Sequence, residues 1–141
     1  MLNVTEMAEE LREITAWQET PEVLSLPDYI KIVVRAVKRF FVDINHPDEY
    51  NQSLWTVNDS NETCYDRDFL LDEEEYIKIL CRLEFFQRVQ TDVNNSFGYS
   101  TNALTLTNAD KPYENLKDTI SDIQHERRIA FNKMVRYTLG T

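Results

Sequence analysis

The sequence predicts an all-α fold: a single helical domain over residues 1–141, with four main helices, a long C-terminal helix and a short extended or β arm before it. Four stretches repeat apolar residues every three or four positions, which is the period of an amphipathic helix. Glycine occurs only twice in 141 residues, which leaves few positions for the tight turns of an all-β fold. A hydrophobic content of 42% over this length suits one globular domain with its own core.

The first helix is expected near residues 4 to 18, where apolar side chains recur at helical spacing. Asn3 is placed to cap this helix, with Glu6 three residues later as its capping-box partner. Pro21 and Pro27 follow. Because proline disfavours the helical conformation of the residue before it, we expect a short linker between the two prolines.

The second helix is expected near residues 28 to 44, with Pro27 and Asp28 at its first turn. Its wide apolar face should make it central to the core. The tripeptide Asn45-His46-Pro47 is expected to end it. The opposite face is basic and reads as an ordinary solvated face or a subunit contact; it carries Lys31, Arg35, Lys38 and Arg39.

Residues 56–69 are predicted to form an acidic surface loop, because Asn, Asp, Ser and Thr side chains compete with the backbone ladder and favour turns. A third helix follows near residues 71 to 93, with Asp72 as its cap and glutamates in its first turn, where the helix dipole favours negative charge. The excess of acidic residues is concentrated in residues 1–28 and in residues 45–75.

Residues 99–107 are predicted to be an extended arm, because this is the only stretch with β-like residues and partial alternation. The last helix is expected near residues 112 to 138, with Gly140 as its stop. One charged residue, Arg127, occupies a position on the apolar stripe of that helix. The predicted core consists of Ile30, Val34, Val37, Phe41, Ile77, Leu80, Leu83, Ile120 and Ile123.

Composition argues against several classes of function. A formal charge of −10 makes a broad grip on nucleic acid unfavourable. Clustered glycines for a phosphate-binding loop are missing. Two cysteines at distant positions indicate a reducing compartment. The N-terminal stretch does not look like a secretory signal, and no apolar run is long enough for a membrane span.

No motif points to a catalytic residue, a cofactor or a metal. His46, His125, Cys64 and Cys81 lack the short spacing by which one turn offers two zinc ligands. The glutamates at 73–75 invite comparison with magnesium-binding helical nucleotide pyrophosphatases, but the next turn presents a lysine instead of a carboxylate. We therefore expect a protein that is not an enzyme.

In size, in helix order and in the stretch TNALTLTNADKPYENLKDTISDIQHERRIAFNKMVRYTL, the chain resembles small head-to-tail connector (adaptor) proteins of tailed bacteriophages. In that family a ring of about twelve subunits joins the portal to the tail and leaves a channel for DNA. The resemblance implies a homo-oligomeric structural protein of the virion, assembled in the host cytoplasm. Its partners would be the portal protein and tail or neck proteins, and DNA would pass without specific binding.

The resemblance matches residues Tyr99 to Thr107 to the extended arm of the family and Tyr113 to Tyr137 to its packing helix. Within the arm, uncharged residues could add a strand to a neighbouring subunit. Aromatic residues at element ends are also enriched at interfaces. The predicted interface residues are Tyr99, Leu104, Leu106, Tyr113 and Trp55.

Two other functions remain open at the level of sequence. A monomeric acidic inhibitor could present carboxylates to a basic enzyme as a mimic of DNA. A metal-dependent helical nucleotide hydrolase could use the glutamates of the third helix. Oligomeric state, competition with DNA and magnesium-dependent turnover distinguish the three hypotheses.

Overall fold

The computed structural model describes the backbone of residues 1–16, 24–99 and 107–139, and the side chains of residues 1–15, 24–91 and 116–135. Within these residues the chain forms four α-helices and one small antiparallel sheet. The mostly helical fold is confirmed, and the sheet was not predicted. The elements are β1 (Leu2–Asn3), α1 (Val4–Ala16), α2 (Leu26–Asp43), β2 (Trp55–Val57), β3 (Thr63–Tyr65), α3 (Leu71–Tyr99) and α4 (Thr107–Leu139), with 3-10 turns at Pro47–Glu49 and Gln52–Leu54.

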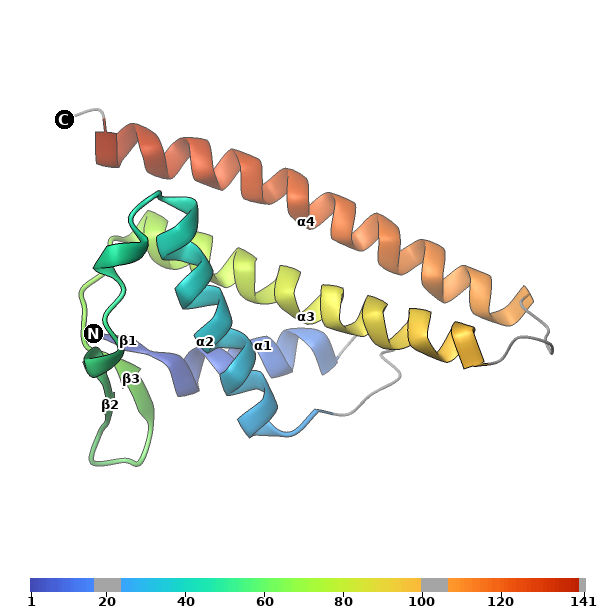
Figure 1. Cartoon of the computed structure of the whole chain (residues 1–141), viewed down its shortest axis with the longest axis horizontal. Helices are drawn as coiled ribbons and strands as arrows, with labels where there is room; N and C mark the ends of the chain where they lie inside the picture. The colour runs from blue at the N-terminus through green and yellow to red at the C-terminus, as the bar shows by residue number, and fades with distance from the viewer. Residues whose placement is uncertain (17–23, 100–106, 140–141) are drawn as a thin grey trace.

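Helix α3 is the centre of the arrangement and contacts each of the other three helices. Figure 1 shows α4 running antiparallel beside α3, while α2 crosses α3 and α1 lies next to α2. The paired helices α3 and α4 continue past α1 and α2 at the end where α3 finishes and α4 begins (Figure 1). The molecule is therefore a helical body from which a two-helix hairpin projects.

Helices α1 and α2 begin where local signals place them, and α2 also ends where they do. Asn3 Oδ1 accepts a hydrogen bond from the Glu6 backbone N–H at 3.0 Å, which confirms the predicted cap. Ser25 and Asp28 bond to each other across the first turn of α2. At its other end Asn45 adopts a φ of 63°, and the His46 N–H bonds back to the Phe41 carbonyl. This is a Schellman motif, in which asparagine takes the place usual for glycine.

The prediction of a surface loop over residues 56–69 is wrong in part, because β2 and β3 form a hairpin there. Asn58 Oδ1 accepts the backbone N–H groups of Ser60 and Glu62, and Asn61 adopts a φ of 61°. These asparagines build a turn without glycine. The hairpin is stabilised by a partner distant in sequence, since β3 also pairs with β1 in the register Leu2 to Tyr65.

Helix α3 begins without the predicted cap. The Leu70 N–H donates to Glu73 Oε1 at 2.8 Å, so Glu73 reaches back over the first turn. Asp72 lies inside the helix instead and pairs with Lys133 on α4 at 3.7 Å. The Leu70 carbonyl accepts the Glu74 N–H, so the helix starts before the predicted cap and Asp72 falls within its first turn.

The predicted arm at 99–107 is helical at both ends, because Tyr99 is the last residue of α3 and Thr107 is the first of α4. Residues 100–106 lie outside the described residues. Both helices therefore extend beyond the expected limits at 93 and 112.

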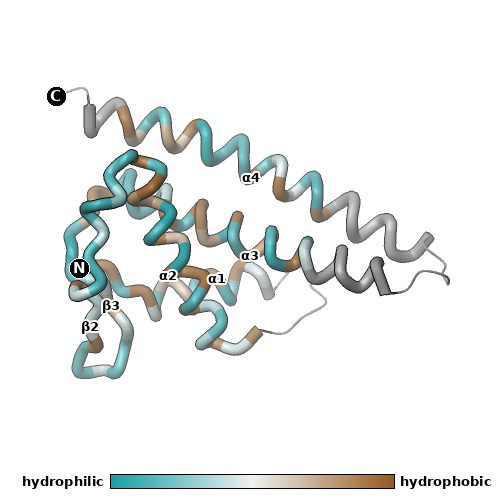
Figure 2. The backbone as a smooth tube through the Cα atoms, in the orientation of Figure 1, coloured by the Kyte–Doolittle hydropathy of each residue, from teal (hydrophilic) through white to brown (hydrophobic). Residues whose placement is uncertain are grey.

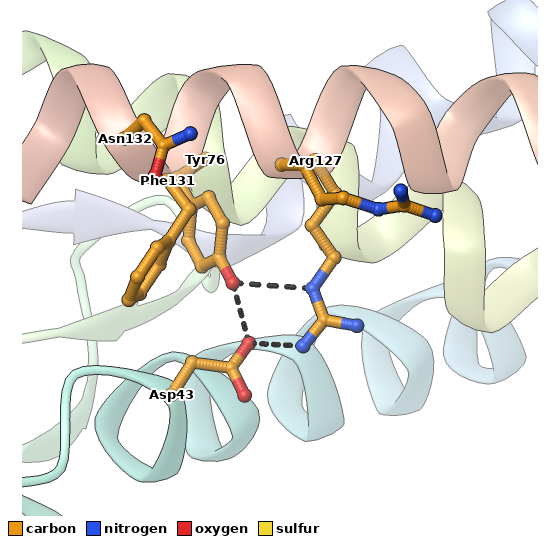
Figure 3. A pocket seen from close by; sticks show the side chains of 6 residues that line it. Asp43, Tyr76, Arg127, Phe131 and Asn132 are labelled. Carbon is orange, nitrogen blue, oxygen red and sulfur yellow. Dashed lines mark hydrogen bonds and ion pairs between the residues drawn. The ribbon is translucent and has the colours of Figure 1, made fainter.

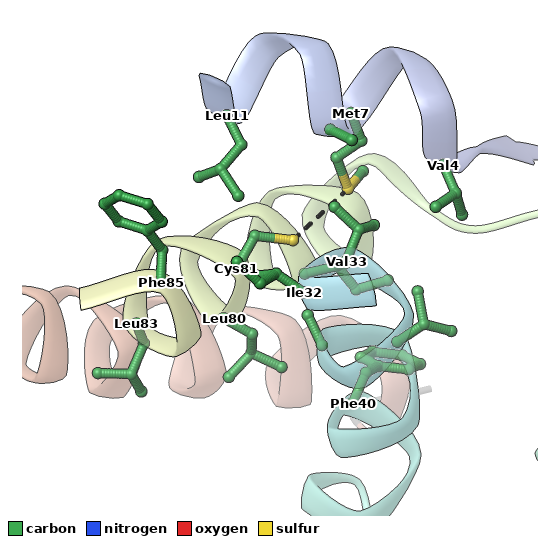
Figure 4. Packing of buried hydrophobic residues seen from close by; sticks show 14 of the residues in the cluster. Val4, Met7, Leu11, Ile32, Val33, Phe40, Leu80, Cys81, Leu83 and Phe85 are labelled. Atoms are coloured by element: carbon green, nitrogen blue, oxygen red, sulfur yellow. Dashed lines mark hydrogen bonds between the residues drawn. The ribbon is translucent and has the colours of Figure 1, made fainter. Parts of the chain in front are cut away.

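The core lies between α1, α2 and α3, and Figure 4 shows side chains from all three helices meeting there. Figure 2 shows hydrophilic and hydrophobic residues alternating along the helices, as amphipathic helices require. Six predicted core residues are confirmed as buried: Val37, Phe41, Ile77, Leu80, Leu83 and Ile123. The other three, Ile30, Val34 and Ile120, are half-buried at the edge of the cluster, because the buried stripe of each helix is narrower than its apolar face.

Among the described residues, no helix is both long enough and apolar enough to span a bilayer. The two cysteines are free thiols, and both are buried. Cys81 points toward α1, where its Sγ lies 3.9 Å from Met7 Sδ (Figure 4). It fills space in the core as a small apolar residue does.

Candidate functional site

A pocket of about 380 Å³ opens where the end of α2, the first turns of α3 and the second half of α4 meet. Figure 3 shows Asp43, Tyr76 and Arg127 of this pocket turned toward one another. The lining residues are Asp43, Tyr76, Arg127, Arg128, Phe131 and Asn132. Three helices distant in sequence contribute to it, so it exists only in the folded chain.

Three side chains of this pocket form a closed hydrogen-bonded network (Figure 3). The Tyr76 hydroxyl donates to Asp43 Oδ2 at 2.5 Å, and Arg127 Nη2 donates to the same oxygen at 2.7 Å. Arg127 Nε donates to the Tyr76 oxygen at 3.2 Å. The Asp43 and Arg127 side chains are only 14% and 22% exposed, so the ion pair is partly shielded from water and stronger than a surface pair.

The charges in this network suit it to hold helices together and do not suit it to transfer protons. Burial raises the pKa of Tyr76 to about 12, so its phenol keeps its proton at neutral pH and serves as a donor. Asp43 balances the charge of Arg127. We conclude that the network ties α4 to α2 and α3.

The rest of the contact between α4 and the body mixes polar and apolar groups. Arg82 of α3 pairs with Glu126, and Asp72 pairs with Lys133. Ile123 and Met134 are the fully buried apolar residues that the described part of α4 contributes. Three charged residues of α4, Glu126, Arg127 and Lys133, thus form ion pairs with α2 or α3.

The shifted pKa of Tyr76 predicts how stability changes in alkali. An unfolded tyrosine loses its proton near pH 10, whereas folded Tyr76 keeps it until about pH 12. Between these pH values the tyrosine is ionised in the unfolded chain but still protonated in the folded one, which stabilises the unfolded state. The contribution of Tyr76 to the free energy of unfolding should therefore fall as pH rises from about 10 to about 12. Between these pH values, urea unfolding should show a smaller decrease in the free energy of unfolding for Tyr76→Phe than for the wild-type protein. Equal slopes for the two proteins would contradict the assignment.

A second cluster gathers aromatic side chains around the hairpin. Trp55 Nε1 donates to the Tyr50 hydroxyl at 2.7 Å, and its ring lies 4.8 Å from the Tyr65 ring. The Arg67 guanidinium lies 4.9 Å from the rings of Phe41 and Phe69. Among the described residues Arg67 Nη1 is buried without a hydrogen-bond partner. The ring contacts anchor the hairpin on the end of α2.

Of the five predicted interface residues, only Trp55 has a described side chain, and it is half-buried in this aromatic cluster. The side chains of Tyr99 and Tyr113 are not among those described, and Leu104 and Leu106 lie outside the described residues. The interface at these five residues therefore stays a prediction.

The described residues contain no group of three or more His, Cys, Asp or Glu side chains that could hold a metal ion. His46 and His125 are exposed, whereas Cys64 and Cys81 are buried. The Glu73 side chain is engaged at the start of α3. These residues do not assemble the ligand sets considered from the sequence.

Sequence reasoning missed the Asp43–Tyr76–Arg127 network, although one signal for it was present. Arg127 occupies a position on an apolar helical stripe, and a buried charge there requires a partner. What could not be read was the identity of that partner, which lies 84 residues away. Comparisons of this chain with protein families, curated proteins and solved structures found no match.

Proposed function

We propose that the protein is a structural subunit of the head-to-tail connector of a tailed bacteriophage. In this proposal copies of the chain form a ring between the portal protein and the tail or neck proteins, with a channel for DNA. The family resemblance of the sequence motivates the proposal, with the long helix α4 as its packing helix. The function would then depend on shape and surface instead of on a reaction.

The observation that supports this proposal most is the projection of α3 and α4 beyond the body (Figure 1). An isolated subunit gains little from extending two helices past the rest of its core, because most of the stability of a helix comes from tertiary packing. A projecting hairpin is useful to a subunit that must reach a neighbour. The candidate site is consistent with this view, since its polar groups hold helices together.

The net charge of −10 also agrees with a channel subunit. A negatively charged protein surface repels phosphate, so DNA can move past it without adhering.

Cryo-electron microscopy of the assembly purified from the cells that produce the protein tests this proposal. We expect a ring of about twelve copies, with closed cyclic symmetry, between portal and tail. Two results would overturn it. One is a compact monomer that displaces DNA from a basic enzyme, which identifies an inhibitor that mimics DNA. The other is magnesium-dependent turnover of a nucleotide, which identifies a hydrolase.

A further inference from the structure

The outer face of α2 carries a straight basic stripe. Lys31, Arg35 and Lys38 follow one another at steps of four and three residues, and all three are exposed. None of them forms an ion pair within the described part of the chain. Val42 continues the stripe by one more step and is 62% exposed. Among the described residues these cations thus have no carboxylate partner, although the Lys38 ammonium lies 5.7 Å from the centre of the Tyr50 ring.

The outer face of α1 carries the opposite charge. Glu6, Glu9 and Glu13 are exposed and follow one another at steps of three and four residues. They form no ion pair within the described residues, whereas their neighbour Glu10 pairs with Lys78 on α3. Arg12 is offset from this stripe around the helix.

The two stripes match when the helices run antiparallel. Along α2 the steps are four and then three, and along α1 read in reverse they are also four and then three. An antiparallel pairing therefore places Lys31 opposite Glu13, Arg35 opposite Glu9 and Lys38 opposite Glu6. In a parallel pairing the order of the steps does not coincide.

The pairing cannot form within one chain. Helices α1 and α2 already contact each other, and the residues that face the shared core are apolar, such as Leu11, Ile32 and Val33. Their charged stripes lie on the outer faces of the two helices, exposed to solvent. A second copy of the chain offers the acidic stripe that the basic stripe lacks.

We propose that the basic stripe on α2 of one subunit docks antiparallel against the acidic stripe on α1 of the next subunit. The inference rests on the proposed ring and names the contact between its neighbours. Each subunit would contact one neighbour through its basic stripe and the other neighbour through its acidic stripe. Such heterologous contacts form a closed ring when the rotation between neighbouring subunits divides a full turn evenly. Charge pairs of this kind set register and partner choice more than affinity.

Reversal of each stripe tests the contact in the full-length chain. The variant K31E/R35E/K38E carries two acidic stripes, and E6K/E9K/E13K carries two basic ones. Each variant alone should self-associate at least about 100-fold more weakly than wild type in analytical ultracentrifugation, because three attractions become repulsions. An equimolar mixture should recover association, since each variant then finds an oppositely charged stripe on the other.

Two controls separate this outcome from loss of folding and from bulk charge. The two-site variants K31E/R35E and E9K/E13K leave Glu6 in the first turn of α1, and all variants should melt cooperatively. The variant D48K/D59K/D66K changes the net charge as much as E6K/E9K/E13K does, at exposed residues off the stripe, and should associate like wild type.

Unchanged association of the folded stripe variants, or failure of their mixture to recover association, would overturn the contact. A ring seen by microscopy would still stand in that case, so the two proposals fail separately. Binding of the wild-type chain to duplex DNA that is lost in K31E/R35E/K38E would also overturn it, because the stripe would then serve nucleic acid.

Discussion

Replacing Val37 by Asp is expected to abolish folding. Val37 lies on the inner face of α2 and is completely buried. A carboxylate at this position would have no partner, and an unpaired buried charge costs several kcal/mol against a total stability of about 5–15 kcal/mol. Thermal unfolding followed by circular dichroism should show no cooperative transition. Leu80→Asp on α3 is expected to behave in the same way, since Leu80 is equally buried.

The same helix supplies a matched control. Val42 is five residues further along α2 and is 62% exposed. Val42→Asp makes an identical chemical change where water can solvate the carboxylate, so the expected loss is less than about 1 kcal/mol. If Val37→Asp melted as cooperatively as Val42→Asp, the position of the core in α2 would be wrong.

The second large effect is expected at the ion pair that attaches α4. Asp43→Ala leaves the Arg127 guanidinium without its carboxylate and the Tyr76 hydroxyl without its acceptor. We expect the free energy of unfolding to fall by about 2–3 kcal/mol, because hydrogen bonds to charged groups contribute more than neutral ones. Arg127→Ala should cost a similar amount. The double variant should cost less than the sum of the two, with a coupling energy of about 1–2 kcal/mol.

An exposed ion pair in the same molecule is the control for this cycle. Glu10 and Lys78 join α1 to α3 at 3.5 Å, with side chains 50% and 44% exposed. Solvent screens such a pair, so its coupling energy should be below about 0.5 kcal/mol. Urea unfolding of both cycles provides the comparison. Equal coupling in the two cycles would show that Asp43 and Arg127 are not shielded from water.

The aromatic cluster and the polar network both lie at the end of α2, where the chain leaves the helix through the Schellman turn at Asn45. Phe41 packs against the hairpin side and Asp43 bonds to α4. One helix end thus connects the sheet, α3 and α4.

Local signals in the sequence were enough to place the starts of the first two helices, the end of the second and most of the core. The Asn3 cap, the first turn at Pro27 and Asp28, and the end at Asn45 depend on side chains only a few residues apart. Val37, Leu80 and Ile123 could be identified as buried because helical spacing alone puts them on an apolar stripe.

Only the tertiary structure decided the features that join distant parts of the chain. The hairpin at Trp55–Tyr65 forms in a segment rich in turn residues because β1 supplies a third strand. The partners of Arg127 lie 51 and 84 residues away in the sequence. The Arg127 guanidinium can be partly buried because the fold places Tyr76 and Asp43 within hydrogen-bond distance of it. Sequence determines what each segment can bury or must neutralise. Which distant segment satisfies that need depends on the packing of the helices, and that packing is a property of the whole chain.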